Sequence, residues 1–326
     1  MNEYWKKNLK PTNQILYSQM VTAFQQKKKD ICCGDFDVKD ISATYEAVYN
    51  DHAEFFYLSF APKISQKVSL FGKGEKSLII DYIFNSQEIK KYEIEIEKIY
   101  NLLKNQLLNL NDVEKEKLIC NYVIKNTNYS INHKMNQNAA TVLLKHEGQC
   151  SGISKAVKLL FDHFNIDSMI VTGEMIDKTT KVSGPHAWNI VKINGVYYHL
   201  DVTSMIGCNM QKIEPFIYLF YNYSDQQMEQ THRWQRSRFP QCISSFNGED
   251  EKIISSLYEL REFLKIINFS LKNSIIFISH IPCTNKEQLV KLISSTTLSV
   301  LSQRKENKKF FIKMVGETVN ISINEV

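Results

Sequence analysis

The sequence lacks an apolar run long enough to cross a membrane. None of its 326 residues belongs to a stretch that approaches the roughly 20 consecutive apolar residues of a spanning helix. The N-terminus, Met1–Lys7, also lacks the apolar core of a signal peptide. We therefore expect a cytoplasmic protein without a membrane span.

The sequence also lacks a concentration of positive charge. The formal net charge is +5, and the lysines are spread out apart from Lys27–Lys29 and Lys308–Lys309. A nucleic-acid surface typically shows a basic stripe interleaved with aromatic residues, and no such stripe is present. Scattered lysines are typical of a solvated surface, so we expect no nucleic-acid partner.

The cysteines show neither a disulfide framework nor a metal-binding pattern. There are seven of them at irregular spacings, so at least one is free or pairs between chains. Cys32 and Cys33 are adjacent but have no CxxC partner. Cys208, Cys242 and His232 are too scattered to indicate zinc. We expect a reducing compartment, no metal and no cofactor.

The length of the chain predicts two or three compact units. Its composition is that of a globular protein with enough aromatic and aliphatic residues for a sizeable core. Apolar periodicity and turn signals divide the chain into an N-terminal α+β subdomain, a central domain and a C-terminal α/β subdomain. We place these at residues 1–88, 89–245 and 246–326.

Periodicity also predicts the individual elements. Helical spacing favours helices over 12–28, 39–50, 86–109, 112–126, 139–144, 250–268 and 286–301. Strand-type runs favour strands over 54–61, 66–71, 77–84, 168–173 and 274–280, and a hairpin of 310–315 and 319–323 around Gly316. We expect a polar loop at 177–184 and irregular structure from Asp201 through Pro240.

Cys150 lies where one further helix is expected to begin. It follows Gly148-Gln149 and precedes an apolar-periodic run from Ile153 to Phe161. At a helix start, unpaired backbone N–H groups and the helix dipole favour a thiolate. A cysteine considered alone is more often a buried structural residue. The residues downstream reverse that interpretation.

A predicted hairpin brings His186 and Asp201 together downstream of this helix. Asn194-Gly195 is the strongest short hairpin signal, and a two-residue loop there pairs Ile193 with Val196. The same register places His186 opposite Thr203 and Trp188 opposite Asp201. His186 and Asp201 are then diagonal neighbours on one face, about 7–8 Å apart. A thiol, a His and an orienting Asp form the arrangement of cysteine acyl transfer.

Simpler roles compete with this interpretation of the hairpin. Asp201 could be a strand-end cap or a turn residue. His199 shares the face of His186, but its partner is Ile190, further from the open end, which makes it a poor base. Trp188 is expected to pack against the His–Asp pair, shield it and line the site.

Together these motifs resemble the transglutaminase-like superfamily, and more narrowly its bacterial members related to papain-type peptidases. The resemblance is carried by Gly-Gln-Cys-Ser-Gly at 148–152, Pro-His-Ala-Trp-Asn at 185–189 and Tyr-Tyr-His-Leu-Asp-Val-Thr at 197–203. It extends to 119–131, 221–225 and 231–234. Within the last segment, His232 and Trp234 match the family pattern and are interpreted as packing and hydrogen-bonding residues.

The resemblance implies a Cys–His–Asp triad of Cys150, His186 and Asp201 in an α+β fold. The helix that carries the Cys would pack on an antiparallel sheet that carries the His and the Asp. Residues 89–245 would be the transglutaminase-like catalytic domain, flanked by N- and C-terminal α/β subdomains. Acidic clusters like the calcium sites of animal transglutaminases are not evident, so we expect no metal requirement.

The sequence departs from the family pattern beside the reacting centre. Many relatives have Gln after the Cys and Ala four residues after it, where Ser151 and Ser154 stand here. Relatives often place an aromatic residue after Asp-Val-Thr, where Ser204 stands here. These departures leave the three residues intact and bear on the substrate pocket.

The implied function is cysteine-dependent acyl transfer on an amide of a protein or peptide, through a thioester. In a peptidase or amidase, water would resolve the thioester, whereas in a transglutaminase a Lys or small amine would do so. A non-catalytic protein- or peptide-binding module on the same fold is the third alternative. The sequence predicts neither the substrate nor the oligomeric state.

In the predicted mechanism, Cys150 attacks a carbonyl carbon, His186 transfers the proton and Asp201 orients the imidazole. The backbone N–H of Cys150 is a natural donor to the oxyanion. Asn138 and Gln149 are candidates for the second donor.

Overall fold

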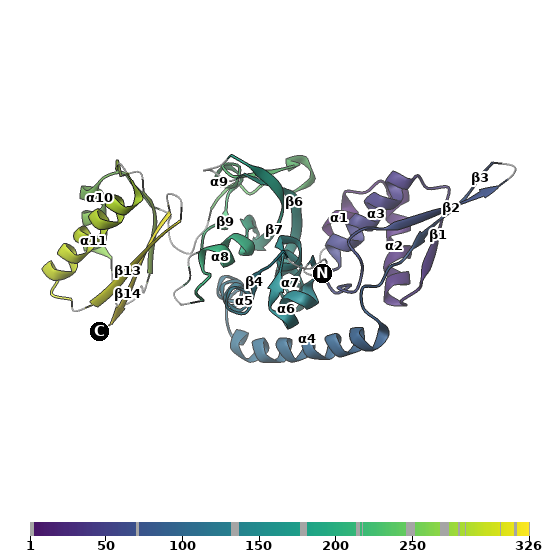
Figure 1. Cartoon of the computed structure of the whole chain (residues 1–326), viewed down its shortest axis with the longest axis horizontal. Coiled ribbons are helices and arrows are strands. Elements are labelled where there is room, and N and C mark those ends of the chain that lie inside the picture. The colour runs from purple at the N-terminus through teal and green to yellow at the C-terminus, as the bar shows by residue number, and fades with distance from the viewer. Residues whose placement is uncertain are drawn as a thin grey trace. The chain divides into compact units, whose positions relative to one another are not determined.

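The structure of the chain, a computed structural model, describes residues 3–69, 72–131, 137–176, 181–212, 216, 218–245, 252–267, 274–279, 281–283, 285–306, 308–315 and 318–325. The chain forms two compact units (Figure 1). The first comprises Met1–Gly207 and Phe220–Ser245, and the second comprises Cys208–Leu219 and Phe246–Val326. The division into three parts at residues 88 and 245 stays a prediction.

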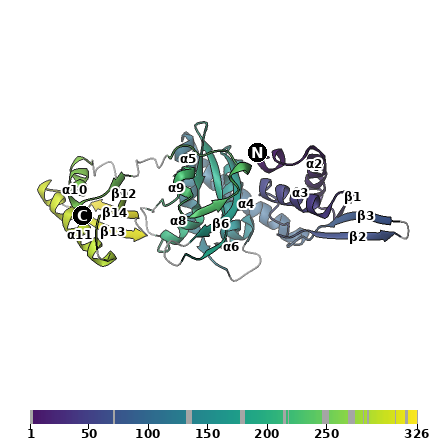
Figure 2. The same ribbon diagram turned by 90° about the horizontal axis from the view of Figure 1, so that it is seen from above.

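The first unit begins with helices and a small antiparallel sheet. The helices are α1 (Tyr4–Lys7), α2 (Pro11–Gln25) and α3 (Val38–Asp51). The strands are β1 (Asp30–Gly34), β2 (Lys63–Ser69) and β3 (Gly72–Ile79), in the order β1-β3-β2. Figure 2 shows β2 and β3 as a long hairpin that extends away from α2 and α3.

The strand predicted over 54–61 is wrong, and β1 takes its place in the sheet. Phe55–Leu58 are buried in succession, and Leu58 makes only an isolated bridge to Tyr82. A short continuous apolar run does not by itself distinguish a strand from other buried structure. In β1, by contrast, Ile31 and Cys33 are buried while Cys32 between them is exposed, which is the alternation of a half-buried strand.

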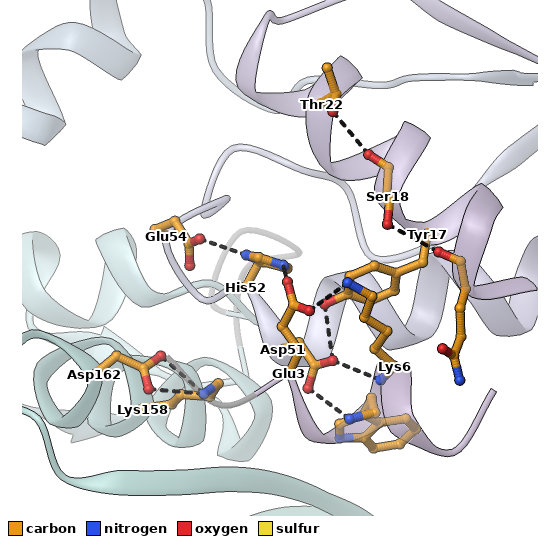
Figure 3. A network of polar contacts seen from close by, with 12 residues as sticks. Glu3, Lys6, Tyr17, Ser18, Thr22, Asp51, His52, Glu54, Lys158 and Asp162 are labelled. Atoms are coloured by element: carbon orange, nitrogen blue, oxygen red, sulfur yellow. Dashed lines mark hydrogen bonds and ion pairs between the residues drawn. The ribbon is translucent and has the colours of Figure 1, made fainter. Parts of the chain in front are cut away.

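Asp51 attaches the N-terminal helix α1 to α3 (Figure 3). Its carboxylate accepts hydrogen bonds from the backbone N–H groups of Trp5 and Lys6, each at 2.9 Å, and from the Tyr17 hydroxyl at 3.0 Å. The Trp5 indole in turn donates to the carbonyl of Ile170 at 2.9 Å. This second bond reaches a strand of the central sheet, so α1 links the N-terminal elements to the core.

Four helices follow the N-terminal sheet. They are α4 (Ser86–Leu107), α5 (Asp112–Asn126), α6 (Ala139–Lys145) and α7 (Cys150–His163). Asn85 and Asn111 form capping boxes at the starts of α4 and α5. Between α5 and α7, β4 (Asn128–Tyr129) pairs in parallel with β5 (Glu147–Gly148). The pairing holds the chain just before Cys150.

An antiparallel five-stranded sheet forms the centre of the first unit. Its strands are β6 (Asp167–Ile176), β7 (Ser183–Ile193), β8 (Val196–Leu200), β9 (Tyr221–Tyr223) and β10 (His232–Trp234), in the order β10-β6-β7-β8-β9. Helix α7 packs on β6 and β7. The buried Asn189 side chain of β7 donates to the carbonyl of Ser154 in α7 at 3.0 Å.

The predicted hairpin register is confirmed from Ile193–Val196 to Asn189–Leu200. Asn194 and Gly195 have φ angles of 51° and 85°, as a tight hairpin turn requires. The predicted pairs beyond Leu200 are wrong, because β8 ends there and helix α8 (Val202–Cys208) begins. Asp201 therefore reaches His186 from a helix start and not from a strand.

The irregular structure predicted through Pro240 is also wrong. After α8 the chain contributes β9, helix α9 (Asp225–Met228), β10 and the short helix η2 (Arg236–Arg238). Both strands have only three residues, which is too short to show a period of two. Their pairing with β8 and β6 comes from contacts distant in sequence.

The second unit is a sheet with two helices. Its elements are β11 (Lys252–Ile254), α10 (Leu257–Ile266), β12 (Ser274–Ser279), α11 (Lys286–Gln303), β13 (Lys308–Val315) and β14 (Thr318–Glu325). The strand order is β11-β12-β14-β13, with β11 and β12 parallel. The long helix predicted over 250–268 is thus a strand followed by a shorter helix. The predicted turn at Gly316 and part of the predicted loop 177–184 lie outside the described residues.

In the part of the chain that the structure describes, every helix is too short or too polar to cross a membrane. Among the longer ones, α4 carries lysines and glutamates along its length.

Glu116 is a fully buried carboxyl that links α5 to β9. Its Oε2 accepts from the Tyr221 hydroxyl at 3.0 Å and from the Asn222 side-chain amide at 2.9 Å. The other oxygen, Oε1, and the Oδ1 of Asn222 are buried acceptors without a hydrogen bond. Burial raises the pKa of Glu116 to about 8, because the two hydrogen bonds oppose it only in part.

We predict that Glu116→Gln stabilises the protein at neutral and mildly alkaline pH. A carboxyl with a raised folded-state pKa takes up a proton on folding, so its stabilisation is complete below about pH 4 and is lost as pH rises towards about 8. Glutamine keeps the shape and carries no charge. Calorimetry should show a melting temperature raised by roughly 2–4 °C at pH 8 and little change at pH 4.5. A variant less stable than wild type at pH 8 would contradict a neutral Glu116.

Candidate active site

Cys150 occupies the first position of α7, after the N-cap residue Gln149. It is partly exposed, whereas the following turns of the helix are buried. The first turn of a helix has N–H groups without intrahelical acceptors, and the helix dipole is positive there. Local sequence therefore places the thiol where a negative charge is favoured.

His186 lies on β7 beyond the point where β8 ends. Its Nε2 is 2.9 Å from Oδ2 of Asp201, and its side chain is only 8% exposed. Since Asp201 occupies Nε2, the other ring nitrogen is the one left for the hydrogen bond between His186 and the Cys150 thiol. The imidazole is thus held between a carboxylate and a thiol.

Asp201 is fully buried and acts at two places at once. Its Oδ1 accepts from the backbone N–H of Ser204 at 3.1 Å, which is the bond of a helix N-cap at the start of α8. Its Oδ2 faces His186 and also accepts from the Ser204 hydroxyl. The Nε2 of His232, on β10, lies 3.4 Å from the same oxygen. The two alternatives for Asp201, a cap and an orienting carboxylate, are therefore both present.

These contacts oppose the effect of burial on all three groups. Burial raises the pKa of the Cys150 thiol, but the hydrogen bond and charge of His186 outweigh it, so the pKa lies below its ordinary value. Burial lowers the pKa of His186, but the charge and hydrogen bond of Asp201 outweigh it and raise the pKa to about 10. Burial raises the pKa of Asp201, yet His186 and His232 hold it well below its usual range.

The directions of these shifts favour separated charges at the site. A lowered thiol pKa next to a raised imidazole pKa favours a thiolate–imidazolium pair over two neutral groups. The backbone N–H groups of Ala187 and Ser151 also lower the pKa of the Cys150 thiol. The geometry is therefore that of an activated thiol nucleophile with an oriented base.

Residues 102–202 match the model of the transglutaminase-like superfamily, and this range contains Cys150, His186 and Asp201. Residues 102–202 thus form a transglutaminase-like region of the chain. The predicted α+β fold class is likewise confirmed, with the Cys-bearing helix α7 on the antiparallel sheet that carries His186.

Solved structures add more distant similarities. A proposed cysteine protease from Cytophaga hutchinsonii is 13% identical with a TM-score of 0.29, over 44% of this chain and 62% of that chain. A structure described as a TGase is 16% identical with a TM-score of 0.31, over 51% of this chain and 48% of that chain. A proposed protease from Parabacteroides distasonis is 8% identical with a TM-score of 0.26, over 81% of this chain and 62% of that chain.

The chain thus spans less than two thirds of each of these structures, and at such TM-scores they support no argument about its activity. Among curated proteins, no match is found.

Trp188 fills the space behind His186. It is completely buried, and its ring stacks on His186 with centroids 6.0 Å apart and planes at 22°. Gly173 of β6, opposite His186, makes room for it. A Cβ at Gly173 would overlap the backbone carbonyl of Arg233 and lie 3.1 Å from the Trp188 ring. Only glycine therefore fits between β10 and Trp188 at this position.

The candidate oxyanion donors have other partners in this structure. Asn138 is the N-cap of α6, and its side chain bonds to Thr141. The Gln149 carboxamide bonds to Gln137 at 3.2 Å and to the carbonyl of Ile131 at 3.4 Å. Trp188, the candidate site-lining residue, packs against His186 and donates its single N–H to His199.

Three further residues lie at the site beside the three predicted ones. His232 and Ser204 both approach the Asp201 carboxylate, and Tyr129 of β4 stands opposite Gly148, two residues before Cys150. Tyr129 is half exposed, and besides burial the charges of Cys150 and Asp201 raise its pKa. The family pattern is the available signal for His232, which is interpreted from the sequence as a packing and hydrogen-bonding residue. The same pattern places Ser204 beside the reacting centre, whereas the contact of Tyr129 requires the fold.

Two groups of residues lie close enough to ligate a metal ion, among the residues that the structure describes: His186 with Asp201 and His232, and His199 with Asp225 and Cys242. In the first group, the Asp201 carboxylate contacts a ring nitrogen of His186, a ring nitrogen of His232 and the hydroxyl of Ser204. A site without a metal stays a prediction.

We predict that Asp201→Asn lowers the pKa of His186 by roughly 1–3 pH units, because an opposite charge at hydrogen-bonding distance favours the protonated ring. The amide keeps an acceptor for Nε2 and removes the charge. Histidine ring resonances followed by NMR against pH will report the shift. The matched control is Asp40→Asn, a partly exposed carboxylate paired with Lys10. Equal His186 titrations in wild type and Asp201→Asn would contradict the proposed charge pairing.

Proposed function

We propose that this transglutaminase-like protein is a cysteine-dependent acyl-transfer enzyme that acts on amide bonds of protein or peptide substrates. The supporting observation is the contact chain from Cys150 through His186 to the buried Asp201. It supplies a nucleophile, a proton carrier and an orienting carboxylate in one place. Cys150, His186 and Asp201 are the proposed catalytic residues.

In the first half-reaction, the Cys150 thiolate attacks the amide carbonyl carbon. A carbon–sulfur bond forms, and the carbonyl π electrons move to oxygen. The tetrahedral intermediate collapses when the carbon–nitrogen bond breaks, and the His186 imidazolium gives its proton to the leaving amine. The products are a thioester on Cys150, a free amine and a neutral His186.

Stabilisation of the oxyanion is assigned to backbone groups at the start of α7. The Cys150 N–H belongs to the first helical turn, where no intrahelical acceptor exists. The N–H groups of Ser151 and Ala187 support the sulfur as a thiolate. The second oxyanion donor is unassigned, because Gln149 and Asn138 bond elsewhere.

In the second half-reaction, neutral His186 removes a proton from the incoming nucleophile, which attacks the thioester. The carbon–sulfur bond breaks and Cys150 leaves as the thiolate. Attack by water gives a carboxylic acid, as in a peptidase or amidase. Attack by a primary amine gives a new amide, as in a transglutaminase. Hydrolysis is the proposed outcome, because water reaches a partly exposed Cys150 without a second binding site.

We predict that Cys150 is required to cleave or modify a member of a complex peptide library. The library is incubated with enzyme in water labelled with heavy oxygen, with and without a small primary amine, and analysed by mass spectrometry. Hydrolysis places heavy oxygen in a new carboxylate, whereas transamidation adds the amine. Cys150→Ala should abolish either product.

The matched control is Cys32→Ser, which removes an exposed cysteine on β1 and should leave turnover unchanged. Tight, unmodified retention of one peptide by wild type and Cys150→Ala alike would contradict the enzyme and indicate a binding module.

A further inference from the structure

A second hydrogen-bonded chain runs behind the proposed catalytic residues. The Trp188 indole N–H lies 2.9 Å from Nδ1 of His199, and Nε2 of His199 lies 2.8 Å from Oδ1 of Asp225. We propose that His199 and Asp225 are positioning residues that fix the Trp188 indole against the ring of His186. This inference rests on the proposed function, because it assigns them a part in activating Cys150.

The hydrogen-bond geometry determines the tautomer of His199. An indole nitrogen can only donate, so Nδ1 of His199 must be the acceptor and carries no proton. The neutral ring then has its proton on Nε2, which donates to Asp225. Protonation of His199 would place two N–H groups against each other at Trp188. Burial, with smaller opposing effects from Asp225, lowers the pKa of His199, in agreement with a neutral ring.

Asp225 is held in place from the other side. It is the first residue of α9, and its backbone N–H donates to the carbonyl of Cys242 at 2.8 Å. Burial raises the pKa of the Cys242 thiol, and the Asp225 charge and a hydrogen bond to it raise the pKa further. Cys242 is therefore a protonated donor to Asp225 and not a second nucleophile. The Asp225 carboxylate is therefore fixed by hydrogen bonds from His199 and Cys242 and by its place at the capped start of α9.

The result is a fixed support for the imidazolium of His186. Trp188 stacks on that ring at 22°, and it also contacts His232 edge-on with centroids 4.9 Å apart. An aromatic face next to a cation stabilises the cation. The groups that face His186 are Asp201, Cys150, His232 and Trp188, and Trp188 is held through its single N–H.

The same geometry disfavours a metal ion on His199, Asp225 and Cys242. An ion there would need the Nε2 lone pair, and the proton of His199 would move to Nδ1. That proton would face the Trp188 N–H at a separation of 2.9 Å between nitrogens. The three groups therefore serve as a hydrogen-bonded support.

The test is the pH dependence of iodoacetamide labelling at Cys150, resolved by mass spectrometry, in wild type, His199→Leu and His199→Gln. Leucine removes both hydrogen bonds. Glutamine restores an acceptor for Trp188 and a donor for Asp225. The acidic limb of the profile is the pH range in which the labelling rate rises as Cys150 loses its proton. We expect the midpoint of this limb to move up by roughly 0.5–1 pH unit in His199→Leu. In His199→Gln the midpoint should return most of the way to its wild-type pH.

Leu16→Ala is the control for lost stability alone. Leu16 is a fully buried residue of α2, so the variant should have a lower melting temperature. The midpoint of its acidic limb should stay at the wild-type pH. An unmoved limb in folded His199→Leu would overturn the inference and leave the proposed function intact. A wild-type limb near the ordinary thiol value of about 8.5 would overturn the proposed function itself.

A measurement on wild type alone keeps the inference testable if His199→Leu does not fold. NMR of the histidine nitrogens should show His199 neutral, with the proton on Nε2 and none on Nδ1. A proton on Nδ1 would overturn the inference. Binding of one equivalent of zinc per chain that Cys242→Ser abolishes would overturn it as well.

Discussion

The hydrogen bond between Nε2 of His186 and Oδ2 of Asp201 is the contact on which the candidate site depends. A fully buried carboxylate is costly unless it is paired and hydrogen-bonded, and Asp201 meets this condition by contacts with His186, Ser204 and His232. The same carboxylate caps α8, so the helix that leaves the sheet and the ring that faces Cys150 are fixed by one side chain. The proposed thiolate on α7 then faces an imidazole ring whose orientation is set by Asp201.

Strand β10 and helix α9, which follow the β7–β8 hairpin in the chain, add further residues to the candidate site and its surroundings. Strand β10 brings His232 to Asp201, and α9 brings Asp225 to His199. Between them Trp188 fills the centre of an aromatic and histidine cluster, where Gly173 leaves it room. Within this cluster the Trp188 indole donates to His199 and the other ring nitrogen of His199 faces Asp225, so the indole is held by a buried chain of hydrogen bonds.

Local sequence signals predicted the part of the site that depends on neighbours along the chain. The helix start at Cys150 and the Asn194-Gly195 turn each follow from a few residues, and the hairpin register held as far as Leu200. The position of Asp201 did not follow, because the change from strand to helix after Leu200 depends on its own capping bond. Strand β10 and the contact of His232 depend on pairing with β6, about 60 residues earlier, and three residues carry no periodic signal for it.

The central claim is that Cys150 and His186 form a thiolate–imidazolium pair at neutral pH. The direct measurement is the ultraviolet absorbance of the thiolate against pH, taken as the difference between wild type and Cys150→Ser and repeated with His186→Ala. The account predicts that the thiolate signal of Cys150 persists well below the ordinary thiol pKa of about 8.5, and that the His186 variant loses this shift. A thiolate that appears only near or above that value in wild type, with no change in the variant, would contradict the account.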